Sequence, residues 1–206
     1  MLSGALGDLP ERPLEATHRA QTNRAKKVPS PASDNRSMPV SADTLRLHLE
    51  YSKWASQRLL DAAAKLSPEE LARDFQTSDK TLAGTLAHIF AADRIWLSRV
   101  NGISPTGAQA GAFLSDEDRD FGRLQTAWPD VLDRWRAWAE PLTDEQALQR
   151  ISYRDMKGNP YETPLWQIVL HVVNHATHHR GTVSGFLRSM GHTPPALDLI
   201  AFYRSL

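Results

Sequence analysis

Apolar residues recur every three or four positions along most of the chain, which is the period of an amphipathic helix. Long segments of this kind predict helices over about 41–66, 80–100 and 164–190, and a further helix that opens at Ser115 and includes Trp138. Long amphipathic helices with few strands are typical of helical bundles. The pattern therefore predicts an all-α fold, most simply a four-helix bundle.

Shorter signals between the long segments predict how they are connected. The stretch "SPEE" places Ser67 as the N-cap of a short helical turn with a capping box. Residues 151–164 break the helical period and carry the turn residues "GNP", which predicts a short β-hairpin or an irregular crossover before the last long helix. Thr163 is expected to cap that helix, with Pro164 in its first position.

The first 38 residues differ in composition from the rest of the chain. They are rich in Pro, Ser, Arg and Lys and contain few large apolar side chains, so they cannot bury enough surface to order themselves. They also lack the continuous apolar run of a secretory signal. We expect residues 1–38 to be a flexible leader, residues 39–206 to be the folded domain, and the true start of translation to lie downstream of Met1.

Charge and cysteine content narrow the classes of function. Lys plus Arg and Asp plus Glu both count 24, and this balance argues against duplex DNA or an anionic membrane as the main partner. No apolar run approaches the roughly 20 residues that span a bilayer, and we expect a cytoplasmic protein. The sequence has no cysteine, which excludes disulfides, thiolate zinc sites and a cysteine nucleophile. Any metal would be held by His, Asp, Glu or water.

Half of the eight histidines lie close together in the middle of the last predicted helix, in and just before "NHATHHRGT" (174–182). At about 100° per residue, His175 and His179 share one face with the apolar side chains, one turn apart. His178 is rotated off that face, and His171 lies near its edge. Two imidazoles at i and i+4 can point at one metal ion. Two core histidines satisfied by hydrogen bonds are an equally open interpretation.

A third ligand should come from another helix. His88 is the only histidine of the segment 80–100, and small residues surround it on its face of the helix; His48 is a competing candidate. Three imidazoles would leave coordination positions open, as in catalytic sites, and they suit Zn, Ni, Fe or Cu. No H-E-x-x-H motif is present, so protease activity is not expected. Arg180 is expected to be a solvated or ion-paired surface residue rather than an anion clamp or a structural hydrogen-bond fork.

From about Met38 to Arg204 the sequence resembles the DinB/YfiT-like family. The resemblance rests on "YSKWASQRLLDAAAKLSPEEL", "TLAHIFAADRIWLSRVNG" and "HVVNHATHHRG", which follow one another in the family's order. It implies an up-down-down-up four-helix bundle, often a homodimer. It also implies a divalent metal ion, commonly nickel or zinc, held by three histidines, which here are His88, His175 and His179.

Relatives in this family include S-transferases and isomerases that depend on low-molecular-weight thiols. The resemblance therefore implies a metal-dependent thiol S-transferase or hydrolase, with a small-molecule thiol as cofactor and an electrophile as substrate. Two alternatives stay open, namely a non-catalytic metal-binding stress-response protein and a helical interaction protein with structural histidines. The chain has Thr182 where the family often has Gln, and Ser52 and Ser56 where it often has Asn, which puts a particular substrate in doubt.

Overall fold

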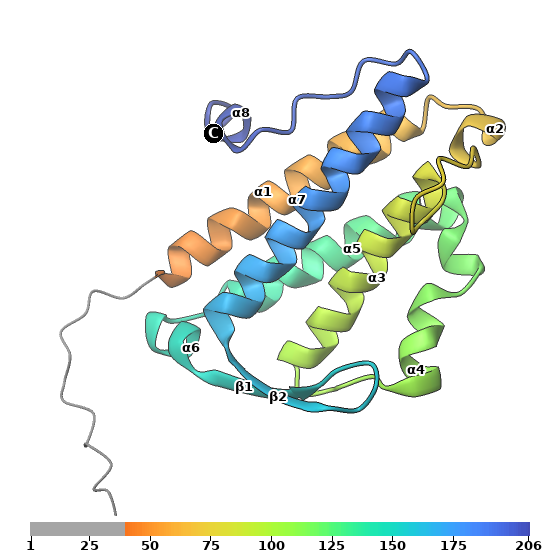
Figure 1. Cartoon of the computed structure of the whole chain (residues 1–206). Helices are drawn as coiled ribbons and strands as arrows, with labels where there is room; N and C mark the ends of the chain where they lie inside the picture. Colours follow the sequence, from red (N-terminus) through yellow and green to blue (C-terminus); the bar gives the residue numbers. More distant parts are fainter. Residues whose placement is uncertain (1–39) are drawn as a thin grey trace, which may run out of the picture. The chain divides into compact units, whose positions relative to one another are not determined.

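The computed structural model describes residues 40–206, and the predicted flexible leader, residues 1–38, lies outside the described residues. The described part is mostly helical (Figure 1). Its four long helices are α1 (Ala42–Ala63), α3 (Leu82–Val100), α5 (Phe121–Ala139) and α7 (Leu165–Ser189). The predicted all-α bundle is confirmed. None of the helices formed by residues 40–206 is long and apolar enough to cross a membrane.

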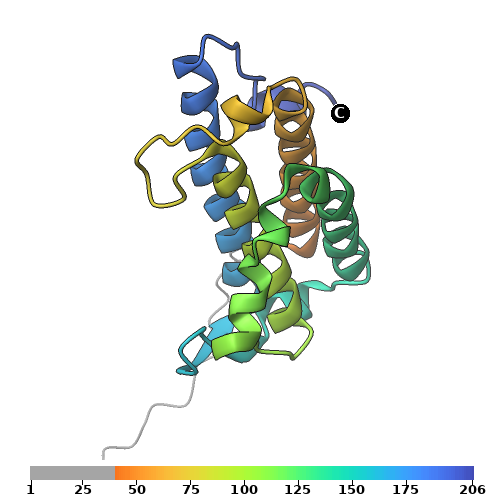
Figure 2. The same cartoon turned by 90° about the vertical axis from the view of Figure 1, so that its right-hand side faces the viewer.

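The four long helices pack as a bundle in which each has two close neighbours. Helices α1 and α3 each pack against both α5 and α7, and so stand on one diagonal of the bundle (Figures 1 and 2). Helices α3 and α7 run antiparallel, because His88 near the start of α3 stacks with His179, while Trp96 near its end stacks with His171. Helices α1 and α7 are parallel to each other, and α3 and α5 run in the opposite direction (Figure 1). This is the expected up-down-down-up order.

Apolar stripes of all four helices meet in one core. Burying each large apolar side chain contributes roughly 1.5–3 kcal/mol, so this core carries most of the stability of the bundle. Its fully buried members include Leu45, Leu59, Leu86, Ile89, Leu124, Trp128, Trp135, Ile168 and Val183. A few polar side chains share the core, among them Ser52, Ser56, Asp93 and Arg180.

Short elements connect the long helices. They are α2 (Pro68–Leu71), α4 (Gly107–Gly111), the 3₁₀ turns η1 (Ala112–Leu114) and η2 (Glu117–Arg119), α6 (Asp144–Leu148), β1 (Arg150–Arg154), β2 (Pro160–Pro164) and α8 (Leu199–Tyr203). Ser67 caps α2 in the predicted capping box. Strands β1 and β2 pair antiparallel and form the hairpin expected before the last long helix.

Two predicted helix starts are wrong. Ser115 opens only a short turn, where its hydroxyl accepts a hydrogen bond from the Asp118 amide, and α5 begins after Asp120, whose carboxylate caps it instead. Thr163 does not cap α7, because it is paired with Ile151 in the hairpin. Pro164 takes the N-cap position without a side-chain hydrogen bond, so α7 begins one residue later than expected.

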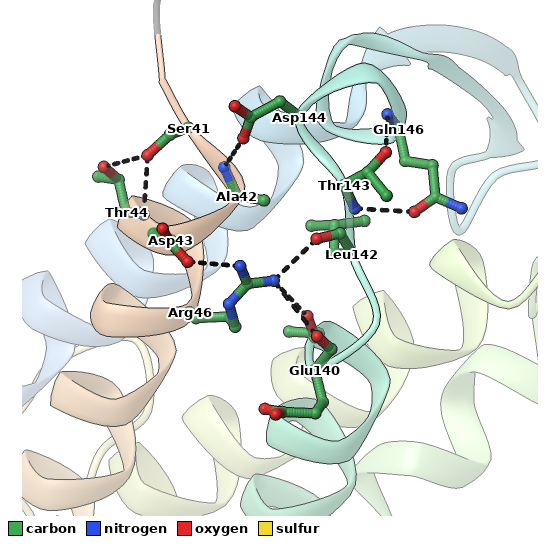
Figure 3. Close-up of polar contacts among 11 residues, drawn as sticks. Ser41, Ala42, Asp43, Thr44, Arg46, Glu140, Leu142, Thr143, Asp144 and Gln146 are labelled. Carbon is green, nitrogen blue, oxygen red and sulfur yellow. Dashed lines mark hydrogen bonds and ion pairs between the residues drawn. The ribbon is translucent and has the colours of Figure 1, made fainter.

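Hydrogen bonds tie the start of α1 to the segment that joins α5 to α6 (Figure 3). The Ala42 amide, one of the free donors of the first helical turn, donates to Asp144 Oδ1 over 2.7 Å. Arg46 donates to the carbonyl oxygens of Leu142 and Ala139 over 2.8 and 3.2 Å. These contacts neutralise the carbonyl end of α5 and hold α1 antiparallel to it.

Candidate metal centre

Three histidines from two helices meet where α3 packs against α7. His88 lies in the second turn of α3, while His175 and His179 lie on successive turns of α7. One ring nitrogen of each lies within 4.8 Å of the others, and the Nε2 atoms of His88 and His175 are 3.1 Å apart. The structure thus brings together the three residues that helical phase and the family resemblance single out.

The position of His88 depends on how α3 begins. Thr81 caps the helix by accepting a hydrogen bond from the Gly84 amide over 2.9 Å, which sets the phase of the following turns. The preceding loop lies directly on this first turn, since a Cβ atom at Gly84 would be 2.3 Å from the Asp79 carbonyl oxygen. Only glycine permits this approach, which carries Asp79 to the side of the helix where His88 lies.

The donor set fits a divalent ion with open coordination positions. Zinc binds imidazole nitrogen at about 2.0–2.1 Å, so two tetrahedral ligands lie roughly 3.3 Å apart, close to the separation of His88 and His175. The side chains of His88 and His179 are 34% and 15% exposed, so a ligand from solvent can reach the group. Three imidazoles with solvent access correspond to an open rather than a closed structural site.

Burial and the neighbouring imidazoles lower the pKa of both His175 and His179. Burial, together with the neighbouring His179 and His88, lowers the pKa of His175 to about 4. Burial, followed by the proximity of His88, also lowers the pKa of His179, and the Asp79 carboxylate partly opposes this. Both rings therefore carry a free lone pair near neutral pH, the form that binds a metal ion.

Asp79 is a neighbour of the histidines that the sequence alone does not reveal. Its two carboxylate oxygens lie 3.6 Å from His88 Nδ1 and 3.8 Å from His179 Nδ1. A carboxylate on the far ring nitrogen commonly fixes the orientation of a metal-binding histidine. Asp79 precedes α3 by a few residues with no motif spacing to the histidines, and only the loop folded over Gly84 brings it there.

The other described histidines do not belong to this group of ring nitrogens, although the His171 ring lies 5.8 Å from that of His175 and the His178 ring 5.0 Å from that of His179. His171 stacks edge-on against Trp96, and His178 is exposed. His48 hydrogen-bonds the Thr44 carbonyl oxygen over 2.8 Å, and His192 pairs with Glu70. The competing candidate His48 therefore does not join the cluster.

The surface role expected for Arg180 is wrong. Its side chain is 1% exposed and donates to Ser52 Oγ over 3.1 Å, to Ser56 Oγ over 3.3 Å and to Thr177 Oγ1 over 2.8 Å. Its guanidinium also lies over the Tyr51 ring. A rotation of about 100°, one residue along the helix, turns Arg180 from the histidine face into the contact with α1, where it acts as a structural hydrogen-bond fork.

Comparisons with known proteins match this chain to one family and to two of its relatives. The model of a family described as the DinB family matches residues 38–205. Protein DinB of Bacillus subtilis (strain 168) is 22% identical over 152 residues, which cover 72% of this chain and 87% of that protein. A crystal structure of a DinB-like protein from Bacillus cereus ATCC 10987 matches with a TM-score of 0.49 and 22% identity, over 76% of this chain and 97% of that one.

Proposed function

The chain belongs to the DinB family, and from this membership and the grouping of His88, His175 and His179 we propose that the protein binds one divalent metal ion through these three imidazoles. The observation that carries the proposal is the convergence of three ring nitrogens from α3 and α7 within 4.8 Å. Three imidazole nitrogens that solvent can partly reach suit Ni²⁺ or Zn²⁺ and leave positions for further ligands.

The reaction we propose is transfer of a low-molecular-weight thiol to an electrophile. When bound, a divalent ion in an open site supplies a Lewis acid that stabilises a thiolate or hydroxide near neutral pH. In this proposal His88, His175 and His179 are the metal ligands. Asp79 lies beside the Nδ1 atoms of His88 and His179 and helps to orient these two rings. The solvent-exposed side of the cluster is where a thiol or water would enter. The family resemblance supports a thiol over water, and hydrolysis is the closest related alternative.

Two other functions use the same residues differently. A non-catalytic metal-binding protein would need the histidines and no substrate, and a helical interaction protein would need only their hydrogen bonds. The 3.1 Å contact between His88 and His175 suits a hydrogen bond between two neutral rings as well as a shared ion. We also propose, from the family resemblance, that the protein is cytoplasmic and forms a homodimer. Light scattering of the untagged protein tests the dimer.

Conjugation assays separate these functions. Untagged protein is loaded with Zn²⁺ or Ni²⁺ and incubated with an alkylating electrophile and, in turn, bacillithiol, mycothiol and other thiols. We expect turnover that is abolished by chelation and by His175→Ala, and retained by His178→Ala, which removes an exposed histidine of the same helix. Metal-replete protein that turns over no thiol would favour the binding-only function.

A further inference from the structure

Arg180 is a buried cation that forms no ion pair within the described residues 40–206. Three hydroxyl groups accept hydrogen bonds from its two terminal nitrogens, but its buried Nε has no acceptor and it forms no ion pair with any carboxylate between residues 40 and 206. Burial lowers the pKa of its guanidinium, which Tyr51 and Asp93 oppose. Burying a charge without a counter-ion is costly, so this arrangement calls for an anion.

A cavity of about 580 Å³ adjoins Arg180. It is lined on one side by Thr177, Arg180, Gly181, Ser184 and Arg188 of α7, and on the other by the segment Pro194–Leu199. This segment leads from α7 to α8 (Figure 1). A cavity of this size suits a small molecule. It is also roomy at the helix surface, because a Cβ atom at Gly181 would meet nothing within 4 Å.

The charges around the cavity favour an anion. Arg180 and Arg188 contribute two guanidinium groups, against one carboxylate from Asp198. Arg188 forms no ion pair within the described part of the chain, and Ser184, one turn earlier on α7, also lines the cavity and offers a hydroxyl donor. Guanidinium groups bind carboxylates and phosphates through paired hydrogen bonds, which a hydroxyl strengthens.

We propose that the cavity between α7 and the segment Pro194–Leu199 binds a small anion that carries a carboxylate or phosphate group, held by Arg188 and Ser184 above the buried guanidinium of Arg180. This site is separate from the histidine group. At 100° per residue, Gly181, Ser184 and Arg188 lie on the side of α7 opposite to His175 and His179. Its ligand therefore differs from anything bound at the histidines, and the inference does not rest on the proposed function.

Titration of the metal-loaded full chain with inorganic phosphate and, separately, with malate tests this site by calorimetry at constant ionic strength. We expect saturable binding of at least one of them with a Kd below about 1 mM. Arg188→Gln should weaken it by about tenfold or more, because a charge-assisted hydrogen bond is lost. Lys157→Gln, which makes the same charge change in the hairpin, should leave the affinity unchanged. Tighter phosphate binding identifies a phosphoryl ligand, and tighter malate binding a carboxylate.

A second variant tests the cavity without removing a charge. Gly181→Leu places a side chain in the open space of the cavity and suits a helix better than glycine, so the protein should stay folded while binding is lost. His175→Ala should retain anion binding, since that residue lies on the opposite face of α7. Absence of binding by both anions, or binding that Arg188→Gln and Gly181→Leu leave intact, would overturn the proposal.

Discussion

The Nε2 atoms of His88 and His175 face each other across 3.1 Å, although 87 positions separate the two residues in the chain. This contact joins the start of α3 to the middle of α7 at a point where both helices also pack through apolar side chains. Because both rings stand on regular helices held by the core, the spacing of the three histidines is set before any ion binds. A preorganised group of this kind binds metal without the cost of ordering its ligands.

Replacing Asp79 should weaken metal binding without unfolding the protein. Its carboxylate oxygens lie 3.6 and 3.8 Å from the Nδ1 atoms of His88 and His179, where a carboxylate favours the ring orientation that turns Nδ1 toward it. We expect Asp79→Asn to reduce zinc affinity by about 10- to 100-fold, the usual cost of losing such a carboxylate. Competition with a chromogenic chelator measures the affinity.

Asp74→Asn is the matched control for Asp79→Asn, because it makes the same charge change in the same loop. Within residues 40–206 the Asp74 side chain accepts a hydrogen bond only from the Gln76 amide. It should bind zinc like the wild type. An equal loss of affinity in both variants would show that loop charge, rather than orientation of the two rings, is responsible.

Ser52 should be important for stability because it is one of the few acceptors available to the buried Arg180. We expect Ser52→Ala to lower the free energy of unfolding by about 1–3 kcal/mol, the cost of leaving a buried donor unsatisfied. Ser184→Ala, measured in phosphate-free buffer, should change it little because that side chain makes no hydrogen bond among the described residues. Urea denaturation followed by circular dichroism compares the two, and equal effects would contradict the role given to Ser52.

Asp93 should make stability fall as pH rises from about 4 to about 7. Burial raises the pKa of its carboxyl to about 7 from an ordinary value of 3.8, against the opposing effects of Trp128 and Arg180. Between these values the folded state holds a proton that the unfolded state releases, so a rise in pH favours unfolding, by on the order of 4 kcal/mol over the whole range.

Asp93→Asn should remove this component of the pH dependence, while Asp130→Asn, on the exposed face of α5, should keep it. Denaturation curves at several pH values between 4 and 8 give the slope of the free energy of unfolding against pH for each variant. If the difference between the wild type and Asp93→Asn is the same at pH 4.5 and pH 7.5, the assignment to Asp93 is wrong.

Acid should release the metal from the site. Protons compete with the ion for the imidazoles, but burial lowers the pKa of His175 to about 4, so this competition is weaker than for free imidazole, whose pKa is about 6.5. We expect release to begin below pH 6.5 and to be complete by about pH 4. Metal in the filtrate after stepwise acidification follows it, and full retention at pH 3 would point to ligands other than histidine.

Much of the fold follows from the sequence because helical periodicity is a local property. The stripe of α7 and the capping residue Ser67 mark their helices without knowledge of neighbours. The same phase argument placed His175 and His179 on one face and turned His178 away from it. The start of α7 was less predictable, because pairing of Thr163 with Ile151 in the hairpin competes with capping.

Features that depend on contacts between helices could not be predicted in this way. The sequence predicts a surface position for Arg180 because arginine is seldom buried, and the contact with the serines of α1 becomes visible only in the folded structure. Asp79 joins the histidines because the loop before α3 folds over Gly84, which no spacing in the sequence encodes. Arg180 contacts serines that are distant along the chain, and Asp79 belongs to no motif that includes the histidines.

The most direct test of the central claim is the metal content of untagged protein after loading with zinc and dialysis. We predict about one zinc ion per chain for the wild type and for His178→Ala, and little or none for His88→Ala, His175→Ala and His179→Ala, all of them folded by circular dichroism. Full zinc occupancy in folded His175→Ala would contradict the account, because the ion would then be held elsewhere.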